Sequence, residues 1–408
     1  MVEGAHGSGT EGDVSDDDAG TPSKVPGPGA SATGVGRRRR RRRRLGCTGV
    51  AVAVLAAGAA GAGWAVYAKL SGNITADEAA AAELARYERE RPTALVRGAQ
   101  NVLLIGSDSR SGDGNARYGR DSGTERSDTT ILLHLAAGRD SATAVSLPRD
   151  LMVDVPGCRR PDGSRTAPVF AQFNHAFAAG GSACTIRTAE KLTGVRVDHH
   201  VVVDFQGFKK LVDALDGVEV CLREPVDDKA AKLKLPAGRV TLDGEQALGY
   251  VRARESLGDG SDTDRMDRQQ RFLGALVSKV QSNDVLLNPV KLYPVLDAAT
   301  SSLTTDPDLA SLRGLYDLVR GLRGIPTERV QFLTVPRESY AGDANRDQLV
   351  EPDAERLFTR LRTDEPVAVE AAPERDAPKS AGKSPEPGTG DSPAPTFSGN
   401  TAAEDICG

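Results

Sequence analysis

The sequence has few cysteines and lacks the short motifs that mark several common classes of protein. Its 408 residues include five cysteines, with no CxxC pair and no Cys/His cluster at zinc spacing, which argues against a structural zinc site and a disulfide scaffold. No Gly-rich phosphate loop and no GxSxG motif occur, so an ordinary NTPase and an α/β-hydrolase serine gain no support. The net charge of −5 and the lack of a DNA-binding helical motif argue against nucleic acid as a partner.

One long uncharged run lies near the N-terminus. The stretch from Leu45 to Ala68 is rich in Ala and Gly and is long enough, as a helix, to cross a hydrocarbon core of about 30 Å. Eight arginines, Arg37 to Arg44, directly precede it, and positive charge beside a span stays in the cytoplasm. We therefore predict a single-pass signal anchor in the cell membrane with a cytoplasmic N-terminus, rather than a cleaved signal peptide or a nuclear-localisation patch.

Composition divides the chain on either side of this span. Residues 1–44 are rich in Gly, Ser and Asp and end in the arginine run, which predicts a disordered cytoplasmic tail. Residues 69–98 are Ala/Glu-rich and predict a stalk, with a short helix from Thr75 to Arg91. Residues 99–363 form one extracytoplasmic domain, and residues 364–408, rich in Pro and Ala, predict a disordered outer tail.

The predicted outer domain has a mixed α/β pattern. Short apolar runs predict strands at residues 101–105, 129–135, 142–147, 199–204, 218–222 and 330–335. Amphipathic stretches predict helices at residues 205–215, 244–254, 264–280, 289–303, 308–322 and 352–362. Strands separated by helices indicate an α/β fold with a central mixed sheet covered by helices on both faces.

Charged residues cluster where these predicted elements end. Three strand ends each pair a carboxylate with an arginine, namely Asp108 with Arg110, Asp128 with Arg126, and Asp150 with Arg149. A fourth cluster contains Arg252, Arg254, Asp262, Arg265, Arg268 and Gln269. Arginine binds phosphate through two parallel hydrogen bonds, and aspartate binds Mg²⁺ together with phosphate oxygens. Any single pair is more simply a surface ion pair, but four clusters at consecutive element ends favour a metal-assisted pyrophosphate site.

The histidines offer no convincing nucleophile or base. His134, His199 and His200 lie on predicted strands, where a structural role is the simpler interpretation. His175 and Asn174 lie where a loop leads into a helix and are better candidates. Asn174 is either a polar contact of the site or a helix cap.

Two cysteines in the outer domain are candidates for a disulfide. Outside the cell, a disulfide between Cys158 and Cys184 would stabilise the fold by on the order of 3 kcal/mol. The alternative is two free thiols. Cys221 looks like a buried strand residue, Cys47 lies in the membrane span, and Cys407 would be the unpaired cysteine of the tail.

A set of motifs between Ala99 and Phe272 resembles the LytR–CpsA–Psr family of bacterial cell-envelope proteins. These are NVLLIGSDSR from Asn101, RSDT from Arg126, VSLPRD from Val145, FNHAF from Phe173, VDFQGF from Val203, LDGEQA from Leu242, RAR from Arg252 and DTDRMDRQQ from Asp262. The resemblance implies a phosphotransferase that moves a glycopolymer from an undecaprenyl-pyrophosphate carrier to a peptidoglycan acceptor through a phosphodiester.

The resemblance also implies roles for individual residues. It assigns Mg²⁺ or Mn²⁺ to Asp108 and Asp128, and catalysis to Arg149, Arg252, Arg254 and Asp150. It assigns pyrophosphate binding to Arg110, Arg126, Arg149, Asn174, Arg252, Arg254, Asp262, Arg265, Arg268 and Gln269. Either Asp150 or Asp108 would deprotonate the acceptor hydroxyl. The lipid would lie in an apolar groove formed by residues 205–215 and 272–280, whose alternative role is ordinary core.

Three other functions use the same residues or a different part of the chain. A non-catalytic protein that binds polyprenyl pyrophosphate would use the same arginines. A lipid pyrophosphatase would differ only in taking water as the acceptor. A membrane-bound transcriptional regulator has the least support, because the only basic patch adjoins the membrane span.

Overall fold

The computed structural model describes residues 34–107, 127–160, 162–253, 262–282, 288–370, 396–404 and 407. The chain forms two compact units, Met1–Gly63 and Trp64–Gly408. Helix α1 (Gly34–Asn73) contains the stretch Val52–Asn73, which is long and apolar enough to cross a membrane, judged by length and composition. The arginine run belongs to this helix, so the prediction of a disordered tail is wrong for residues 34–44.

A mixed sheet forms the centre of the second unit and has nine strands in the part of the chain that is described. In spatial order these are β1 (Thr75–Ala76), β12 (Leu303–Thr305), β7 (His199–Val203), β2 (Gln100–Ser107), β3 (Ser127–Leu135), β4 (Ala142–Leu147), β13 (Val330–Thr334), β17 (Thr396–Thr401) and β16 (Ala368–Glu370). Strand β3 is antiparallel to both β2 and β4, whereas β7 is parallel to β2 and β13 is parallel to β4. The ends of β7, β2, β4 and β13 therefore meet at one edge of the sheet, beside the start of β3.

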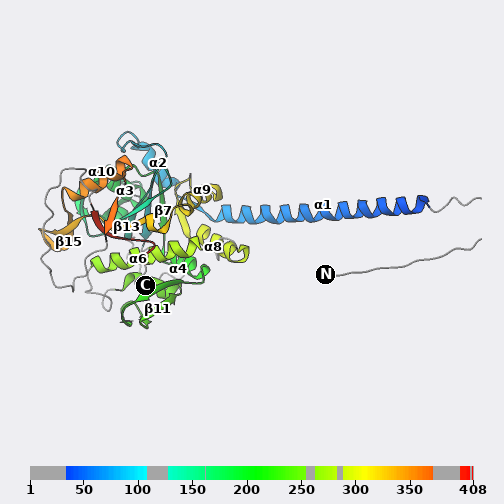
Figure 1. Ribbon diagram of the computed structural model, residues 1–408. Helices are drawn as coiled ribbons and strands as arrows, with labels where there is room; N and C mark the ends of the chain where they lie inside the picture. The colour runs from blue at the N-terminus through cyan, green and yellow to red at the C-terminus, as the bar shows by residue number, and fades with distance from the viewer. Residues whose placement is uncertain are drawn as a thin grey trace, which may run out of the picture. The chain divides into compact units, whose positions relative to one another are not determined.

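Helices cover both faces of this sheet (Figure 1). On one face lie α2 (Glu78–Arg86), α3 (His175–Thr193) and α10 (Asp353–Thr363), which share a core with Leu103 and Leu132. On the other face lie α6 (Asp262–Gln281) and α9 (Leu312–Arg323), which pack against Ile131 and Phe332. Ile131 and Leu132 are neighbours on β3 but belong to different cores, because successive side chains of a strand point to opposite faces of the sheet. The predicted α/β fold is confirmed.

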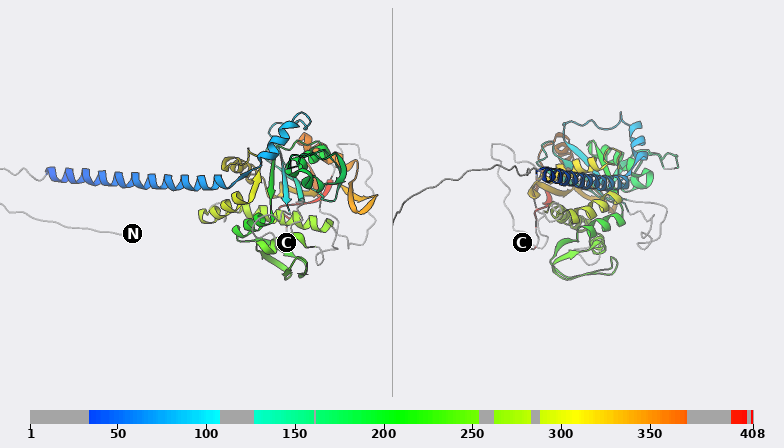
Figure 2. Two further views of the ribbon diagram at one scale, coloured as in Figure 1. Left: turned by 180° about the vertical axis from the view of Figure 1, so that it is seen from behind. Right: turned by 90° about the vertical axis from the view of Figure 1, so that its right-hand side faces the viewer.

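A second, smaller core lies beside the main sheet. It packs α4 (Phe205–Ala214), α5 (Gly244–Arg252) and part of α6 against two antiparallel ribbons, namely β8 (Val218–Leu222) with β11 (Gly238–Leu242) and β9 (Val226–Asp228) with β10 (Leu233–Leu235). Figure 2 shows these ribbons, in green, on the side of α4 and α6 that faces away from the main sheet. Val212 and Phe272 are 0% and 1% exposed. These two residues of the apolar faces predicted to hold a lipid are core, whereas Phe208, Ala275 and Leu276 of the same faces are partly buried against it.

Helix α3 begins at His175, where the sequence predicts that a loop leads into a helix, but its extent was not predicted, and two further ribbons have no counterpart among the predicted strands. The ribbons join β5 (Met152–Val155) to β6 (Val169–Gln172) and β14 (Arg337–Tyr340) to β15 (Asp343–Leu349). Helix α3 is kinked at Gly180 and Gly181, and Gly181 has a φ of +63°. Its Ala, Gly and Thr content gives only a weak helical pattern, which explains why sequence periodicity missed it.

The predicted stalk and outer tail both contribute to the folded unit. Strand β1 pairs with β12, and Leu70 is 3% exposed. Strands β17 and β16 extend the sheet beyond β13, at the end of the strand order opposite to β1, and Phe397 is buried there. The short helix predicted between Thr75 and Arg91 is present as α2, whereas the prediction of a disordered outer tail is wrong for residues 368–370 and 396–401. These strands were missed because short strands depend on partners far away in the sequence.

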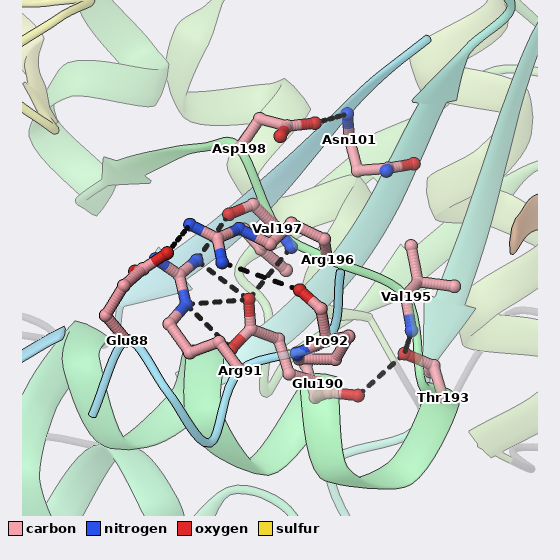
Figure 3. A network of polar contacts seen from close by, with 11 residues as sticks. Glu88, Arg91, Pro92, Asn101, Glu190, Thr193, Val195, Arg196, Val197 and Asp198 are labelled. Atoms are coloured by element: carbon pink, nitrogen blue, oxygen red, sulfur yellow. Dashed lines mark hydrogen bonds and ion pairs between the residues drawn. The ribbon is translucent and has the colours of Figure 1, made fainter. Parts of the chain in front are cut away.

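The segment after α2 is fastened to the domain by a buried ion pair (Figure 3). Arg91 Nη2 lies 2.7 Å from Glu190 Oε1 on α3 and donates to the Val197 carbonyl at 2.6 Å. The Glu190 carboxylate also accepts from the Val197 amide at 3.0 Å. Each charge is thereby paired and hydrogen-bonded, which a buried ion pair requires.

Two disulfides join described residues of the chain. Cys158 is bonded to Cys184, the candidate pair, with 5.6 Å between their Cα atoms. Cys221 on β8 is bonded to Cys407, with 5.8 Å between their Cα atoms. The prediction that Cys407 is unpaired is therefore wrong. Their separation of 186 residues concealed this pairing from sequence spacing.

Candidate functional site

The sheet edge brings together three of the predicted site residues. Asp128 is at the start of β3, while Arg149 and Asp150 follow β4. Arg149 Nη1 lies 2.9 Å from Asp128 Oδ1, and Arg149 Nε lies 3.1 Å from Asp150 Oδ2. The side chains of Arg149 and Asp128 are 23% and 36% exposed. The guanidinium is therefore held in a fixed orientation and remains accessible to an anionic ligand.

Asp150 connects this cluster to two elements that the sequence did not predict. Its Oδ1 accepts a hydrogen bond from Gln172 Nε2 on β6 at 2.5 Å and lies 3.6 Å from Arg346 Nη1 on β15. The Asp150 carbonyl also accepts from the Asp347 amide at 3.1 Å. Sequence reasoning missed Gln172 and Arg346 because their positions depend on two ribbons without a clear strand pattern.

The start of α3 is bonded to the same loop. The Asn174 amide donates to the Arg149 carbonyl at 3.0 Å, and Asn174 is buried. Asn174 occupies the N-cap position of α3, as one of the two interpretations predicted, but its side chain makes no capping hydrogen bond. His175, the first residue of α3, is exposed.

Arg252 marks the opposite side of the edge. It is the last residue of α5 and is exposed, and its guanidinium carbon lies 4.7 Å from the centre of the Phe205 ring. Phe205 begins α4 directly after β7. This cation–π contact places the Arg252 guanidinium next to the end of β7.

Helix α6 joins the end of α5 to the sheet. Gln269 Nε2 donates to the Val251 carbonyl at 3.1 Å, and its Oε1 lies 3.5 Å from the Thr129 hydroxyl. Arg268 donates to the Ala253 carbonyl. Arg265 and Arg268 are each 6% exposed, and burial lowers the pKa of Arg268. These side chains therefore shape the segment that contains Arg252.

Several predicted residues cannot be located in this geometry. Four of them lie outside the described residues, namely Asp108, Arg110, Arg126 and Arg254. Asp262 is the first residue of α6, and its side chain is not among those described. Ser107, which precedes Asp108, pairs with Ser127, which precedes Asp128. The chain therefore leaves β2 next to Asp128.

The described donor set is compatible with a hard divalent cation. In the described part of the chain, no group of three or more His, Cys, Asp or Glu side chains could hold a metal ion. Mg²⁺ needs only one or two carboxylates when phosphate oxygens and water complete its shell. Asp128 supplies one accessible carboxylate at the edge, so this position fits the predicted role.

The strand histidines have structural partners. His134 lies between Asn101 and Asp364, with ring nitrogens 2.8 and 2.9 Å from their oxygens, and burial lowers its pKa. His199 Nδ1 lies 3.2 Å from Asp306 Oδ1, a hydrogen bond that raises its pKa. These contacts support the structural interpretation of both residues.

A cavity of about 750 Å³ adjoins the edge on the β7 side. Its lining includes Ser107 at the end of β2, Asp204 and Lys210 around α4, and Arg159 and Arg160 from the loop after β5. The lining contains charges of both signs. Asp204 directly precedes Phe205, which contacts Arg252, so the cavity lies next to the end of β7.

The fold and the motifs at the sheet edge place the chain in a known family. The model of the LytR_cpsA_psr family matches residues 68–363, so the chain belongs to this family. It is 37% identical over 272 residues to the probable cell wall biosynthesis protein LcpB of Corynebacterium glutamicum, covering 64% of this chain and 61% of that protein.

Two further relatives agree with this assignment. The chain is 34% identical over 207 residues to the polyisoprenyl-teichoic acid–peptidoglycan teichoic acid transferase TagU of Enterococcus faecalis, covering 50% of this chain and 61% of that protein. The solved LytR-Csp2A-Psr enzyme from Actinomyces oris matches with a TM-score of 0.52 and 22% identity, over 66% of this chain and 93% of that one, which shows the fold. The matched region thus spans about 61% of each of the two curated relatives.

Proposed function

We propose that this protein is a phosphotransferase that moves a glycopolymer from an undecaprenyl-pyrophosphate carrier to peptidoglycan. The observation that carries the proposal is Arg149, held between Asp128 and Asp150 at the edge of the sheet. The names of relatives, which include a teichoic acid transferase, support the reaction class.

Charge at this edge suits a pyrophosphate. Arg149 lies in the middle of the edge and Arg252 at the end of β7, so two arginines can bind separate oxygens of the ligand. Such contacts stabilise the charge that develops as the transferred phosphoryl group separates from polyprenyl phosphate. Mg²⁺ at Asp108 and Asp128 would neutralise further charge on the phosphates. Asp150 and Asp108 remain the two candidates for the base that deprotonates the acceptor hydroxyl.

We also propose that the N-terminus is cytoplasmic and the larger unit extracytoplasmic. The arginine run before the span supports this orientation. The two disulfides support it independently, because such bonds persist in oxidising compartments. Alkaline phosphatase fused after Gly408 should be active in the intact bacterium, whereas a fusion active only in the cytoplasm would contradict the orientation.

The central test uses the full-length protein in detergent with a polyprenyl-pyrophosphoryl saccharide, Mg²⁺ and a peptidoglycan oligomer. We expect release of polyprenyl phosphate together with a new saccharide–peptidoglycan phosphodiester. Both products should be lost in Arg149→Ala and Asp128→Ala. Arg313→Ala is the matched control, because the Arg313 side chain on α9 is 89% exposed.

The other outcomes separate the competing functions. Release of polyprenyl phosphate without the phosphodiester would indicate a lipid pyrophosphatase. Tight binding of the lipid that depends on Arg149, without release, would indicate a non-catalytic binding protein. Equal activity of Arg149→Ala and the wild type would contradict the proposed site.

A further inference from the structure

A pair of aromatic side chains, one exposed and one half-buried, lies near the candidate site. Phe170 on β6 and Tyr340 on β14 have ring centroids 6.1 Å apart and planes inclined by 57°. Phe170 is 52% exposed, and the neighbouring Val169 is also exposed. Phenylalanine is usually buried, and exposed aromatic side chains that cluster often mark a binding surface.

The backbone holds this pair in place. Strand β6 pairs with β5, and β14 pairs with β15. A Cβ atom on Gly342 would lie 2.6 Å from Cε1 of Tyr340, so the Tyr340 ring lies directly over the glycine of the hairpin turn. A larger residue at position 342 would require the Tyr340 ring to shift. Two rings fixed by strands form a surface that needs little reordering when a ligand binds.

The aromatic pair is connected to Arg149 through one strand. Phe170 and Gln172 are two residues apart on β6, so their side chains share a face and are separated by roughly 7 Å along the strand. Gln172 donates to Asp150, which in turn accepts from Arg149. A ligand that covered Phe170 would therefore lie within reach of the phosphate-binding arginine.

The strand order separates Tyr340 from the cavity, with β4 and Arg149 between them. Phe205 and Arg252 lie at the end of β7, next to the cavity that Asp204 lines. Strand β4, which precedes Arg149, separates β7, β2 and β3 from β13, and β14 follows β13 directly in the chain. The β7 side therefore suits the donor, which leaves the β14 side for the acceptor.

Charge at the β14–β15 hairpin favours an uncharged saccharide surface over a polyphosphate. The hairpin contains three carboxylates and two guanidiniums, namely Glu338, Asp343, Asp347, Arg337 and Arg346. It therefore has no surplus of positive charge to attract the anionic donor polymer. Gln348 and Glu338 form a hydrogen bond of 2.8 Å on the exposed ribbon, so donors and acceptors for hydroxyl groups are present.

We propose that Phe170 and Tyr340 form a subsite that binds a sugar ring of the peptidoglycan acceptor strand. This proposal rests on the transferase function proposed above. A pyranose ring has an apolar C–H face that can pack on an aromatic ring, while its hydroxyl groups hydrogen-bond to polar side chains at the rim. Gln172 and Arg346, which both contact Asp150, are polar side chains beside the aromatic pair that can meet these hydroxyl groups.

The test measures glycan binding and donor binding separately. Full-length protein in detergent is titrated with a soluble, uncross-linked peptidoglycan oligomer in the absence of lipid donor. We expect Phe170→Ala and Tyr340→Ala each to raise the Kd roughly tenfold, which corresponds to the loss of one aromatic contact. Phe170→Trp should retain affinity. Tyr316→Ala, at a 62% exposed tyrosine on α9, is the matched control and should bind like the wild type.

Transfer kinetics provide a second readout. Phe170→Ala should raise KM for the acceptor about tenfold and leave KM for the lipid donor unchanged. Unchanged glycan affinity in both alanine variants would overturn the subsite. A loss of donor affinity instead of acceptor affinity would overturn the acceptor assignment. Dissociation of a wild-type oligomer in Phe170→Ala, with glycan binding intact, would show a protein–protein contact instead.

The same measurements distinguish failure of the subsite from failure of the transferase proposal. A wild-type protein that binds the glycan in a Phe170-dependent way but transfers nothing would retain the subsite and refute the transferase. A wild-type protein that transfers saccharide, with Phe170→Ala equal to it in acceptor KM, would retain the transferase and refute the subsite.

Discussion

Arg149 determines the electrostatics of the candidate site at the scale of single residues. Its guanidinium contacts Asp128 through Nη1 and Asp150 through Nε, so two carboxylates orient one planar group. The backbone carbonyl of Arg149 also accepts a hydrogen bond from the backbone amide of Asn174, which directly precedes α3. Both the side chain and the main chain of this residue are therefore fixed before any ligand binds.

Replacing Arg149 by lysine tests this geometry without changing the charge. A lysine ammonium is a single point donor and cannot reproduce the planar fork that contacts both carboxylates. We expect Arg149→Lys to lower kcat of the transfer reaction by about 10²–10³-fold, with little change in Tm. Arg313→Lys should keep the wild-type rate. A lysine variant with wild-type kcat would show that charge alone suffices.

At the scale of elements, α6 is the part that holds the site together. Gln270 is 3% exposed, and its Nε2 donates to the Ser146 hydroxyl at 3.1 Å and to the Thr334 hydroxyl at 2.9 Å. Ser146 is on β4 and Thr334 on β13. The helix is thus bonded to the two strands that lead to Arg149 and to the β14–β15 hairpin.

Gln270→Leu should therefore affect both stability and activity. Removing the amide deprives two hydroxyl groups near the core of their donor, at a cost of roughly 1–3 kcal/mol in the free energy of unfolding. We expect a Tm lower by a few degrees and a reduced kcat. Gln281→Leu on the same helix is the control, since Gln281 makes one longer bond of 3.3 Å to the Leu322 carbonyl and another of 3.5 Å to the Ile325 carbonyl. An equal effect of both changes would argue against a specific role of Gln270.

The start of α2 depends on an ionised carboxylate. Asp77 caps this helix, accepting from the Ala80 amide at 3.0 Å, and it also accepts from Ser182 and contacts His200 Nε2 at 3.3 Å. Burial opposes its ionisation, but these hydrogen bonds outweigh burial and lower the pKa of Asp77 from 3.8 to about 2. The charged form is therefore favoured by folding.

This pKa shift predicts a specific loss of stability in acid. Because the folded pKa lies below the unfolded one, the stabilisation is complete above about pH 4 and is lost as the pH falls towards 2. We expect it to amount to on the order of 1–2 kcal/mol after allowance for solvent screening. Denaturant unfolding at pH 5 and pH 2.5 should show a gap between wild type and Asp77→Asn that narrows in acid. A gap independent of pH would contradict the assignment.

At the scale of the whole molecule, the C-terminal segment contacts several elements that are far away in the sequence. Strand β17 pairs with β13, the Ala402 amide donates to the Val330 carbonyl at 2.9 Å, and Ser278 on α6 donates to the Ala402 carbonyl at 3.1 Å. The disulfide from Cys407 to Cys221 then joins this segment to β8. The segment thus connects the main sheet, α6 and the smaller core.

Removal of this disulfide should destabilise the folded unit. The double change Cys221→Ser and Cys407→Ser opens a separation of 186 residues, and we expect a loss of about 2–5 kcal/mol in the free energy of unfolding. Calorimetry of the full chain under non-reducing conditions measures the effect. Cys47→Ser leaves both bridges intact and should match the wild type. An unchanged Tm in the double variant would contradict a stabilising role.

Periodicity and motif order in the sequence determined much of the fold and the centre of the site. Long apolar strands such as 129–135 and amphipathic helices such as 264–280 are visible because their patterns are local. Asp128, Arg149 and Asp150 were identifiable because charged residues directly follow or precede such strands. The helix long and apolar enough to cross a membrane was equally clear from its length and its flanking arginines.

Tertiary structure alone decided the parts that depend on distant partners. The pairing of β17 with β13 and the bond between Cys221 and Cys407 join segments that share no local pattern. Gln172 and Arg346 reach Asp150 only because two short ribbons meet there. Short strands have too few residues to show a period and gain their stability from packing, so their positions follow from contacts that no local window of sequence contains.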